Sequence, residues 1–402
     1  MKRRRAAQTT EAIRSVRMIP LISIIKDHIH SFQTAPFTAD WASLISAAKR
    51  HEVSAILYAQ CKDFIPEPFL ADLKRYHSTV LYFYANRRKL TGRVEEALRG
   101  MEHFTIKGAS IAEFYPCPAY RTMGDTDIVI HKEDRNEADR RLRGLGLKCV
   151  SSFDDREWQY YLHHMEFELH DRLVYNESVN TDAQEQYFND CWKHVKDGKL
   201  DWEFHFMFLI FHLRKHFMNS GVGFRHFMDI AVLTSRGPKI DWSRIKEELV
   251  NIGLWPFTER IFALNQYWFG VLTPLPVSAF SDTFLSSATE LILKNGVFGF
   301  DNENNAGNSA VNAIRDKNHS HSAMIKTAAR KIFPAYETMI KVPQYSYLKG
   351  HPYLLPVAWM QRAVRSLVYK RVAKDMKTVI RGSFVDKETI QRREAIYEQW
   401  GV

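Results

Sequence analysis

Hydrophobic residues recur every three or four positions through both ends of the chain, a spacing that predicts amphipathic helices. Residues 40–61 show it in Trp41, Leu44 and Ala48, and residues 82–98 continue the pattern among many charged residues. Toward the C-terminus the same spacing predicts helices over 202–217, 224–233 and 242–252. The chain is therefore expected to begin and end in helical regions.

Between about residues 100 and 175 the apolar runs are shorter, which predicts strands at 103–106, 125–130, 147–153 and 165–173. Residues 133–145 form an amphipathic helix ending at Gly144 or Gly146, because glycine is favoured just past a helix C-terminus. We therefore predict an α+β fold, a small mixed sheet with helices on one side and large helical regions on either flank. The expected units are an N-terminal helical region (1–95), a core (96–200) and a C-terminal helical domain (201–402).

The composition indicates a folded, cytoplasmic protein. Of 402 residues, 45% are hydrophobic and 13% aromatic, which excludes disorder for the bulk of the chain. The cysteines are scattered, so a disulfide framework or zinc module is not expected; they are Cys61, Cys117, Cys149 and Cys191. The apolar stretch Met18–Ile25 is short for a secretory signal, and the densest apolar run, Phe204–Leu213, is far below the roughly 20 residues of a membrane helix.

The charge balance points to phosphate-bearing partners. The chain carries 56 Lys and Arg against 46 Asp and Glu, a net charge of +10, and part of the excess gathers between Arg362 and Arg381. Such a surface attracts nucleotides, nucleic acid or anionic lipid, although a solvated helix face is the simpler interpretation of this segment. The stretch 295–320, rich in Asn, Gly and Ser, is expected to be a connecting loop, with a lid as the alternative.

The candidate chemistry begins with Asp125 and Asp127 in the sequence Gly-Asp-Thr-Asp-Ile-Val-Ile. Side chains two apart share one face of a strand, so these carboxylates repel unless a cation lies between them. Mg²⁺ bound together with substrate phosphates suits such a pair. Two solvated carboxylates at a strand start are the alternative.

Three neighbours extend this pair. The turn Gly108-Ala109-Ser110 leads into a short helix, where backbone N–H groups can approach a phosphate. Lys107 and Arg121 flank the carboxylates with positive charge, either toward phosphate or as ordinary salt-bridge partners. The stretch 165–171 places Glu166, Glu168 and His170 on one strand face, which supplies a third carboxylate.

This set resembles the nucleotidyltransferase superfamily with the polymerase-β-like fold. That pattern has Gly-Gly or Gly-Ser at a helix start, an Asp-x-Asp strand and a third acidic residue on a later strand. Glu168 corresponds best to the third carboxylate, and Ala109 stands where the pattern has its second Gly or its Ser. More closely, Ile106–Ala109, Tyr120–Asp127 and Glu168-Leu169-His170 resemble the bacterial family of uncharacterised nucleotidyltransferases.

The resemblance implies nucleotidyl transfer, in which an NMP moves from an NTP to an acceptor with release of pyrophosphate. Asp125, Asp127 and Glu168 would hold two Mg²⁺ or Mn²⁺ ions, with Glu168 close enough to take the acceptor's proton. The nucleotide would lie against Lys107, Gly108, Ala109, Ser110, Arg121 and Gly124. Glu166, His170, His216 and Asp229 are expected around this set, His170 as a residue that orients a ligand.

Several questions stay open at this level. The acceptor is a small molecule, a protein or an RNA end, and the sequence does not choose among them or set the oligomeric state. His212 and His216 are spaced i, i+4, which suits either a metal pair or ordinary core histidines. The rival function is a non-catalytic, basic module that binds nucleotide or nucleic acid on the same fold.

Overall fold

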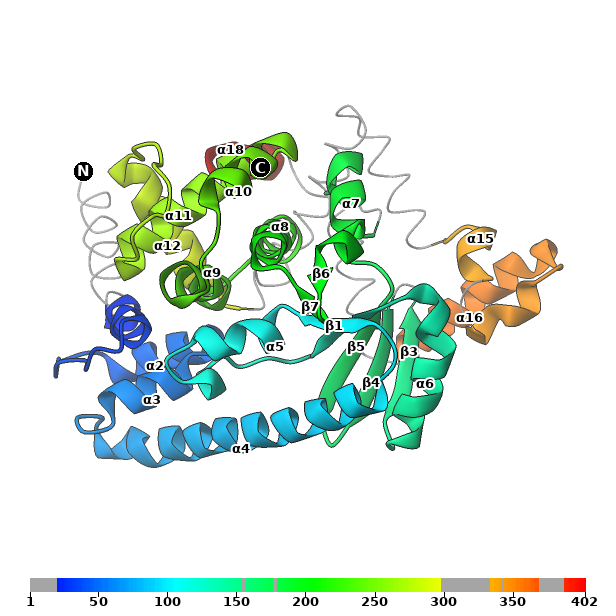
Figure 1. Cartoon of the computed structure of the whole chain (residues 1–402), viewed down its shortest axis with the longest axis horizontal. Helices are drawn as coiled ribbons and strands as arrows, with labels where there is room; N and C mark the ends of the chain where they lie inside the picture. Colours follow the sequence, from blue (N-terminus) through cyan, green and yellow to red (C-terminus); the bar gives the residue numbers. More distant parts are fainter. Residues whose placement is uncertain (1–19, 154–156, 176–178, 298–332, 341–342, 369–386) are drawn as a thin grey trace.

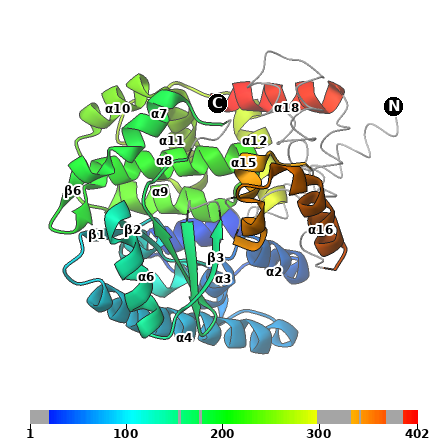
Figure 2. The same ribbon diagram turned by 90° about the vertical axis from the view of Figure 1, so that its right-hand side faces the viewer.

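We describe the protein from a computed structural model that covers residues 20–153, 157–175, 179–297, 333–340, 343–368 and 387–402. Within these ranges a five-stranded mixed sheet and a two-stranded sheet combine with many helices, which confirms the predicted α+β class. Figures 1 and 2 both place the long helix α4 (Glu67–Ala97) below the larger sheet and α8 (Trp202–Asn219) above it.

The described part of the N-terminal region, from residue 20 on, is helical, as predicted. Residues 20–29 are helical and are followed by α2 (Trp41–Arg50) and α3 (Ser54–Cys61). Asp40 caps α2 by accepting the backbone N–H of Ser43, which satisfies one of the free donors of the first turn. Helix α4 is 31 residues long and begins well before the predicted stretch 82–98. Its C-terminal part packs under the sheet, where Leu90 and Val94 join the core residues of the strands.

The larger sheet has the strand order β1-β2-β5-β4-β3. Its strands are β1 (His103–Ile106), β2 (Asp127–Ile130), β3 (Lys148–Phe153), β4 (Glu157–Leu162) and β5 (Met165–His170). The central pair β2 and β5 is parallel, and the other pairs are antiparallel. Strand β2 begins at Asp127 and not at 125, β5 ends at His170 and not at 173, and β4 was not predicted.

The two faces of β2 and β5 carry different side chains because successive residues alternate. Ile128, Ile130, Phe167 and Leu169 enter a smaller core with residues of α4 and of α6 (Arg135–Gly144). Val129 faces the other way, into the large core that includes α8. The expectation of helices on one side only is therefore wrong, since both faces of β2 are covered.

After β5, the residues that the structure describes are mainly helical, as predicted. Its elements are α7 (Asp182–Asn189), β6 (Val195–Lys196), β7 (Lys199–Leu200), α8, α9 (Phe224–Arg236), α10 (Trp242–Asn251), α11 (Trp255–Phe269), α12 (Asp282–Asn295), α15 (Tyr336–Met339), α16 (Leu355–Val368) and α18 (Lys387–Trp400). Aromatic residues of α8, α9 and α11 fill the large core, where Phe206, Phe227 and Phe257 are fully buried.

Two predicted features fall largely outside the described residues. Most of the stretch 295–320 lies outside them, and so does the second half of the basic segment that ends at Arg381. Every described helix is too short or too polar to pass through a lipid bilayer.

Candidate functional site

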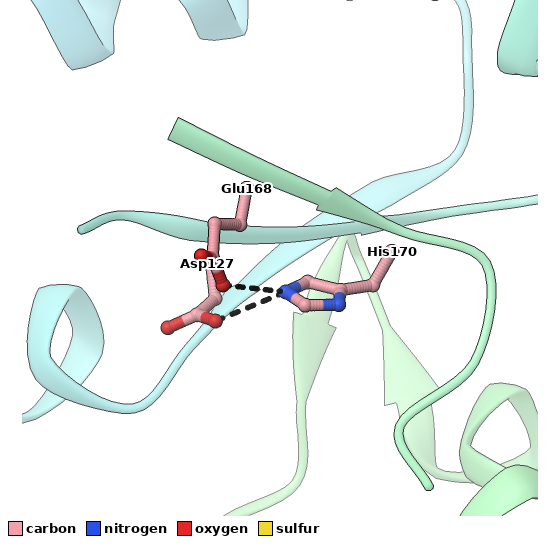
Figure 3. Close-up of side chains that lie close together, drawn as sticks. All are labelled: Asp127, Glu168 and His170. Carbon is pink, nitrogen blue, oxygen red and sulfur yellow. Dashed lines mark hydrogen bonds and ion pairs between the residues drawn. The ribbon is translucent and has the colours of Figure 1, made fainter. Parts of the chain in front are cut away.

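The parallel pairing of β2 and β5 brings two of the predicted carboxylates together. Asp127 lies directly opposite Glu168 in the ladder, and His170 is two residues further along β5 on the same face. One oxygen of each carboxylate and one ring nitrogen of His170 all lie within 4.8 Å of one another. Figure 3 shows the imidazole directed at both carboxylates.

Two cationic groups meet the same oxygen of Asp127. Lys107 Nζ lies 2.6 Å from Asp127 Oδ1, and His170 Nε2 lies 3.0 Å from that oxygen. Burial alone would raise the pKa of Asp127, but these two partners outweigh it and hold the pKa below its usual range. Asp127 is therefore ionised in a place where only 2% of its surface is exposed.

His170 also faces Glu168. Its Nε2 lies 3.6 Å from Glu168 Oε2, while Gln159 Nε2 donates to Glu168 Oε1 at 3.0 Å. Burial alone would lower the pKa of His170, but Asp127 and Glu168 raise it to about 9. Burial would raise the pKa of Glu168, yet its contact with His170 leaves that pKa lowered.

Asp125 lies just before β2 and is half-buried. Burial and the negative charge of Asp127 raise its pKa, and Lys107 offsets them only in part. Among the described residues, the cluster with ligand atoms within 4.8 Å contains Asp127, Glu168 and His170, and Asp125 is outside it. Carboxylates and imidazole are established ligands of divalent cations, so these residues suit such an ion.

Lys107 has an unusual backbone where β1 meets the short helix α5 (Gly108–Ile111). Its φ of 57° and ψ of −130° lie in a region of backbone conformation that residues other than glycine rarely adopt. The backbone N–H of Lys107 donates to His205 Nε2 of α8 at 3.0 Å. Burial lowers the pKa of His205 to about 4, so the ring is neutral and can accept this bond.

The predicted phosphate turn has contacts of its own within the fold. A Cβ on Gly108 would lie 2.8 Å from Arg121 Nη1, so the glycine allows the guanidinium to pass close to the backbone. Ser110 donates its hydroxyl to the carbonyl oxygen of Thr105 at 3.0 Å. Ala109 is half-buried, and Gly124 is exposed, with open space where a Cβ would lie.

Arg121 is held in a buried clamp with Asp229 of α9. Its Nε and Nη2 donate to the two oxygens of Asp229 at 2.8 and 2.7 Å, and its Nη1 donates to the carbonyl of Thr122 at 2.7 Å. The hydroxyl of Tyr115 donates to Asp229 at 2.7 Å. This geometry favours the salt-bridge interpretation of Arg121 over direct contact with phosphate, and it gives Asp229 a structural part.

Arg87 of α4 was missed from the sequence. Its Nη2 donates to the carbonyls of Met123 and Gly124 at 3.3 and 2.9 Å. Its Nη1 donates to the hydroxyl of Thr126 at 3.1 Å and to the carbonyl of Glu166 at 3.3 Å. Arg87 therefore connects strand β5 with the loop of residues 121–126, which we call the Asp125 loop.

The remaining predicted residues lie nearby with different partners. His216 Nε2 and His212 Nε2 are 3.0 Å apart on α8. Burial is the main cause that lowers the pKa of His216 to about 4, and the positive charge of Lys107 is the next. The backbone carbonyl of Glu166 accepts the N–H of Thr126 at 3.0 Å, while its side chain is outside the cluster of described residues that could hold a metal.

Comparison with known proteins yields one match. A family model described as uncharacterised nucleotidyltransferase matches residues 38–270, more than half of the chain. No curated protein and no solved structure shows significant similarity to the chain. The matched range contains every candidate residue named above.

Proposed function

Because the chain belongs to the family of uncharacterised nucleotidyltransferases, we propose that it moves the NMP of an NTP to an acceptor and releases pyrophosphate. The observation that carries this proposal is the pairing of Asp127 with Glu168 on adjacent parallel strands, beside Lys107 and Asp125. The superfamily pattern has a third acidic residue on a strand after the Asp-x-Asp strand, and this pairing supports Glu168 in that position.

The donor set fits divalent cations. Asp125, Asp127 and Glu168 would hold them, and the raised pKa of Asp125 indicates negative charge that a cation would neutralise. When bound, Mg²⁺ or Mn²⁺ would neutralise the phosphates and stabilise the attacking and leaving oxygens.

The chain's own residues have separate parts in the transfer. The acceptor hydroxyl attacks the α-phosphorus, the bond to the bridging oxygen breaks, and pyrophosphate leaves. Glu168, whose pKa is lowered, is ionised and can take the proton of the hydroxyl. The backbone of Lys107 is anchored by His205, and its ammonium group lies beside Asp127. From there the ammonium group can bind the phosphates of the NTP.

The acceptor class is testable directly. The full chain is incubated with each α-labelled NTP, Mg²⁺ or Mn²⁺ and a cell extract separated into protein, RNA and small-molecule fractions. We expect label in one fraction, only with metal, and none with the Asp125→Asn/Asp127→Asn variant. Equal labelling of every fraction by wild type and variant would contradict the transferase.

The rival function has its own signature. A non-catalytic binding module would hold RNA or DNA with strong salt dependence, because phosphate contacts displace counterions. Its affinity would be undiminished by Asp125→Asn. That result, together with no metal-dependent transfer of label, would replace our proposal with the binding module.

Arg87 offers a further prediction for this reaction. We expect Arg87→Gln to lower kcat at least about tenfold, because the Asp125 loop loses its hydrogen bonds to α4. Arg88, exposed on the same helix, provides the matched control Arg88→Gln. Turnover and Mn²⁺ affinity are measured for both variants.

A double-mutant cycle separates positioning from general damage. If Arg87 acts through Asp125, Arg87→Gln will weaken Mn²⁺ binding in the wild-type chain and add little to Asp125→Asn. Additive losses of Mn²⁺ affinity in the double mutant would contradict the role of Arg87 in positioning Asp125.

A further inference from the structure

The position of His170 suits a metal ligand better than a residue that only orients the ligands. A residue that only orients ligands contacts them from outside and offers no atom of its own to the ion. The Nε2 of His170 instead faces both carboxylates, at 3.0 Å from Asp127 Oδ1 and 3.6 Å from Glu168 Oε2. The imidazole nitrogen therefore belongs to the same cluster of potential donor atoms.

The spacing of these atoms suits a common ion. Neighbouring ligands of an octahedral ion, each about 2.1 Å from it, lie about 3 Å apart. The contact between Asp127 Oδ1 and His170 Nε2 has this length, and the third donor is within 4.8 Å. Nε2 now shares a proton with Asp127 Oδ1, and that proton would leave when the ion binds, because a coordinating imidazole nitrogen carries none.

The surroundings hold the ring in this direction. His170 is the last residue of β5 and pairs with Val129 of β2, which is fully buried. Only 7% of the histidine is exposed. The ring therefore has little freedom to turn away from the carboxylates when an ion binds.

We infer that His170 is a direct metal ligand, so that one of the bound ions is held by Asp127, Glu168 and one imidazole, and that this position selects Mn²⁺ over Mg²⁺. This inference rests on the proposed function and deepens it. Mg²⁺ takes oxygen ligands, whereas an imidazole nitrogen adds affinity for first-row transition ions. The carboxylates alone would not make this distinction.

The test is pulsed electron paramagnetic resonance of the full chain loaded with Mn²⁺. A directly bound imidazole gives nitrogen modulation of the electron spin echo. We expect this modulation in the wild type and in the control His164→Gln, which changes an exposed histidine of the β4–β5 turn. We expect it to disappear in His170→Gln.

Affinities provide a second readout. His170→Gln is expected to weaken Mn²⁺ binding at least about tenfold and Mg²⁺ binding less than about threefold. If that variant does not fold, the wild-type spectrum still decides whether nitrogen is bound.

The outcomes separate this inference from the proposed function. Bound Mn²⁺ without nitrogen modulation, or modulation that persists in folded His170→Gln, overturns the inference and leaves the nucleotidyltransferase standing. A wild-type chain that binds no Mn²⁺ and shows no metal-dependent transfer overturns both.

Discussion

Asp127→Asn is expected to reduce nucleotidyl transfer at least about a thousandfold. Asp127 is the central carboxylate of the candidate site, since Lys107 and His170 both contact its Oδ1. The amide is nearly the same size but carries no charge, so it binds a divalent cation weakly and removes one of the charges that hold Lys107 in place.

The fold is expected to survive this change, because Lys107 keeps Asp125 and Glu168 within electrostatic reach. Turnover and Mn²⁺ affinity are measured beside Asp72→Asn, a control on α4 whose side chain is 71% exposed. Turnover within about tenfold of wild type would contradict a catalytic part for Asp127.

Asp229→Ala is expected to lower the free energy of unfolding by about 3–5 kcal/mol, because it leaves the buried charge of Arg121 without its partner. The side chains of Arg121 and Asp229 are only 9% and 7% exposed, and they share two hydrogen bonds. Tyr115 loses its acceptor as well. Urea unfolding measures the change, with Asp72→Ala as the exposed control.

A second variant tests the physical reason. In Arg121→Met/Asp229→Leu both charges are gone, so much of the stability should return, as is found when buried ion pairs are replaced by apolar side chains. A loss below about 1 kcal/mol in Asp229→Ala would show that Arg121 finds water or another partner. The clamp would then not hold the start of the Asp125 loop.

The placement of several candidate residues on one strand face followed from local pattern. Alternation at a period of two correctly placed Glu168 and His170 on one face, and it separated them from Phe167 and Leu169. The same rule would have identified β4, where Trp158, Tyr160 and Leu162 alternate with Glu157 and Gln159. That omission concealed the contact of Gln159 with Glu168.

Other parts depend on contacts that local pattern does not carry. The run Arg87-Arg88-Lys89 is typical of a solvated helix face, yet the partners of Arg87 lie 36 to 79 residues away along the chain. Arg121 and Asp229 are separated by 108 residues. Such pairings arise only when α4 and α9 pack beside the loop, so the sequence suggested the charges and not their partners.

The central claim is that this chain transfers an NMP under metal control, and the release of pyrophosphate tests it most directly. Wild type and Asp127→Asn are incubated with labelled NTP, with and without Mg²⁺ or Mn²⁺, in the presence of the fraction that accepts label. Our account predicts pyrophosphate and transferred NMP in equal amounts, only with metal and only from the wild type. NTP binding with no pyrophosphate under any metal condition, or equal release by both proteins, would contradict it.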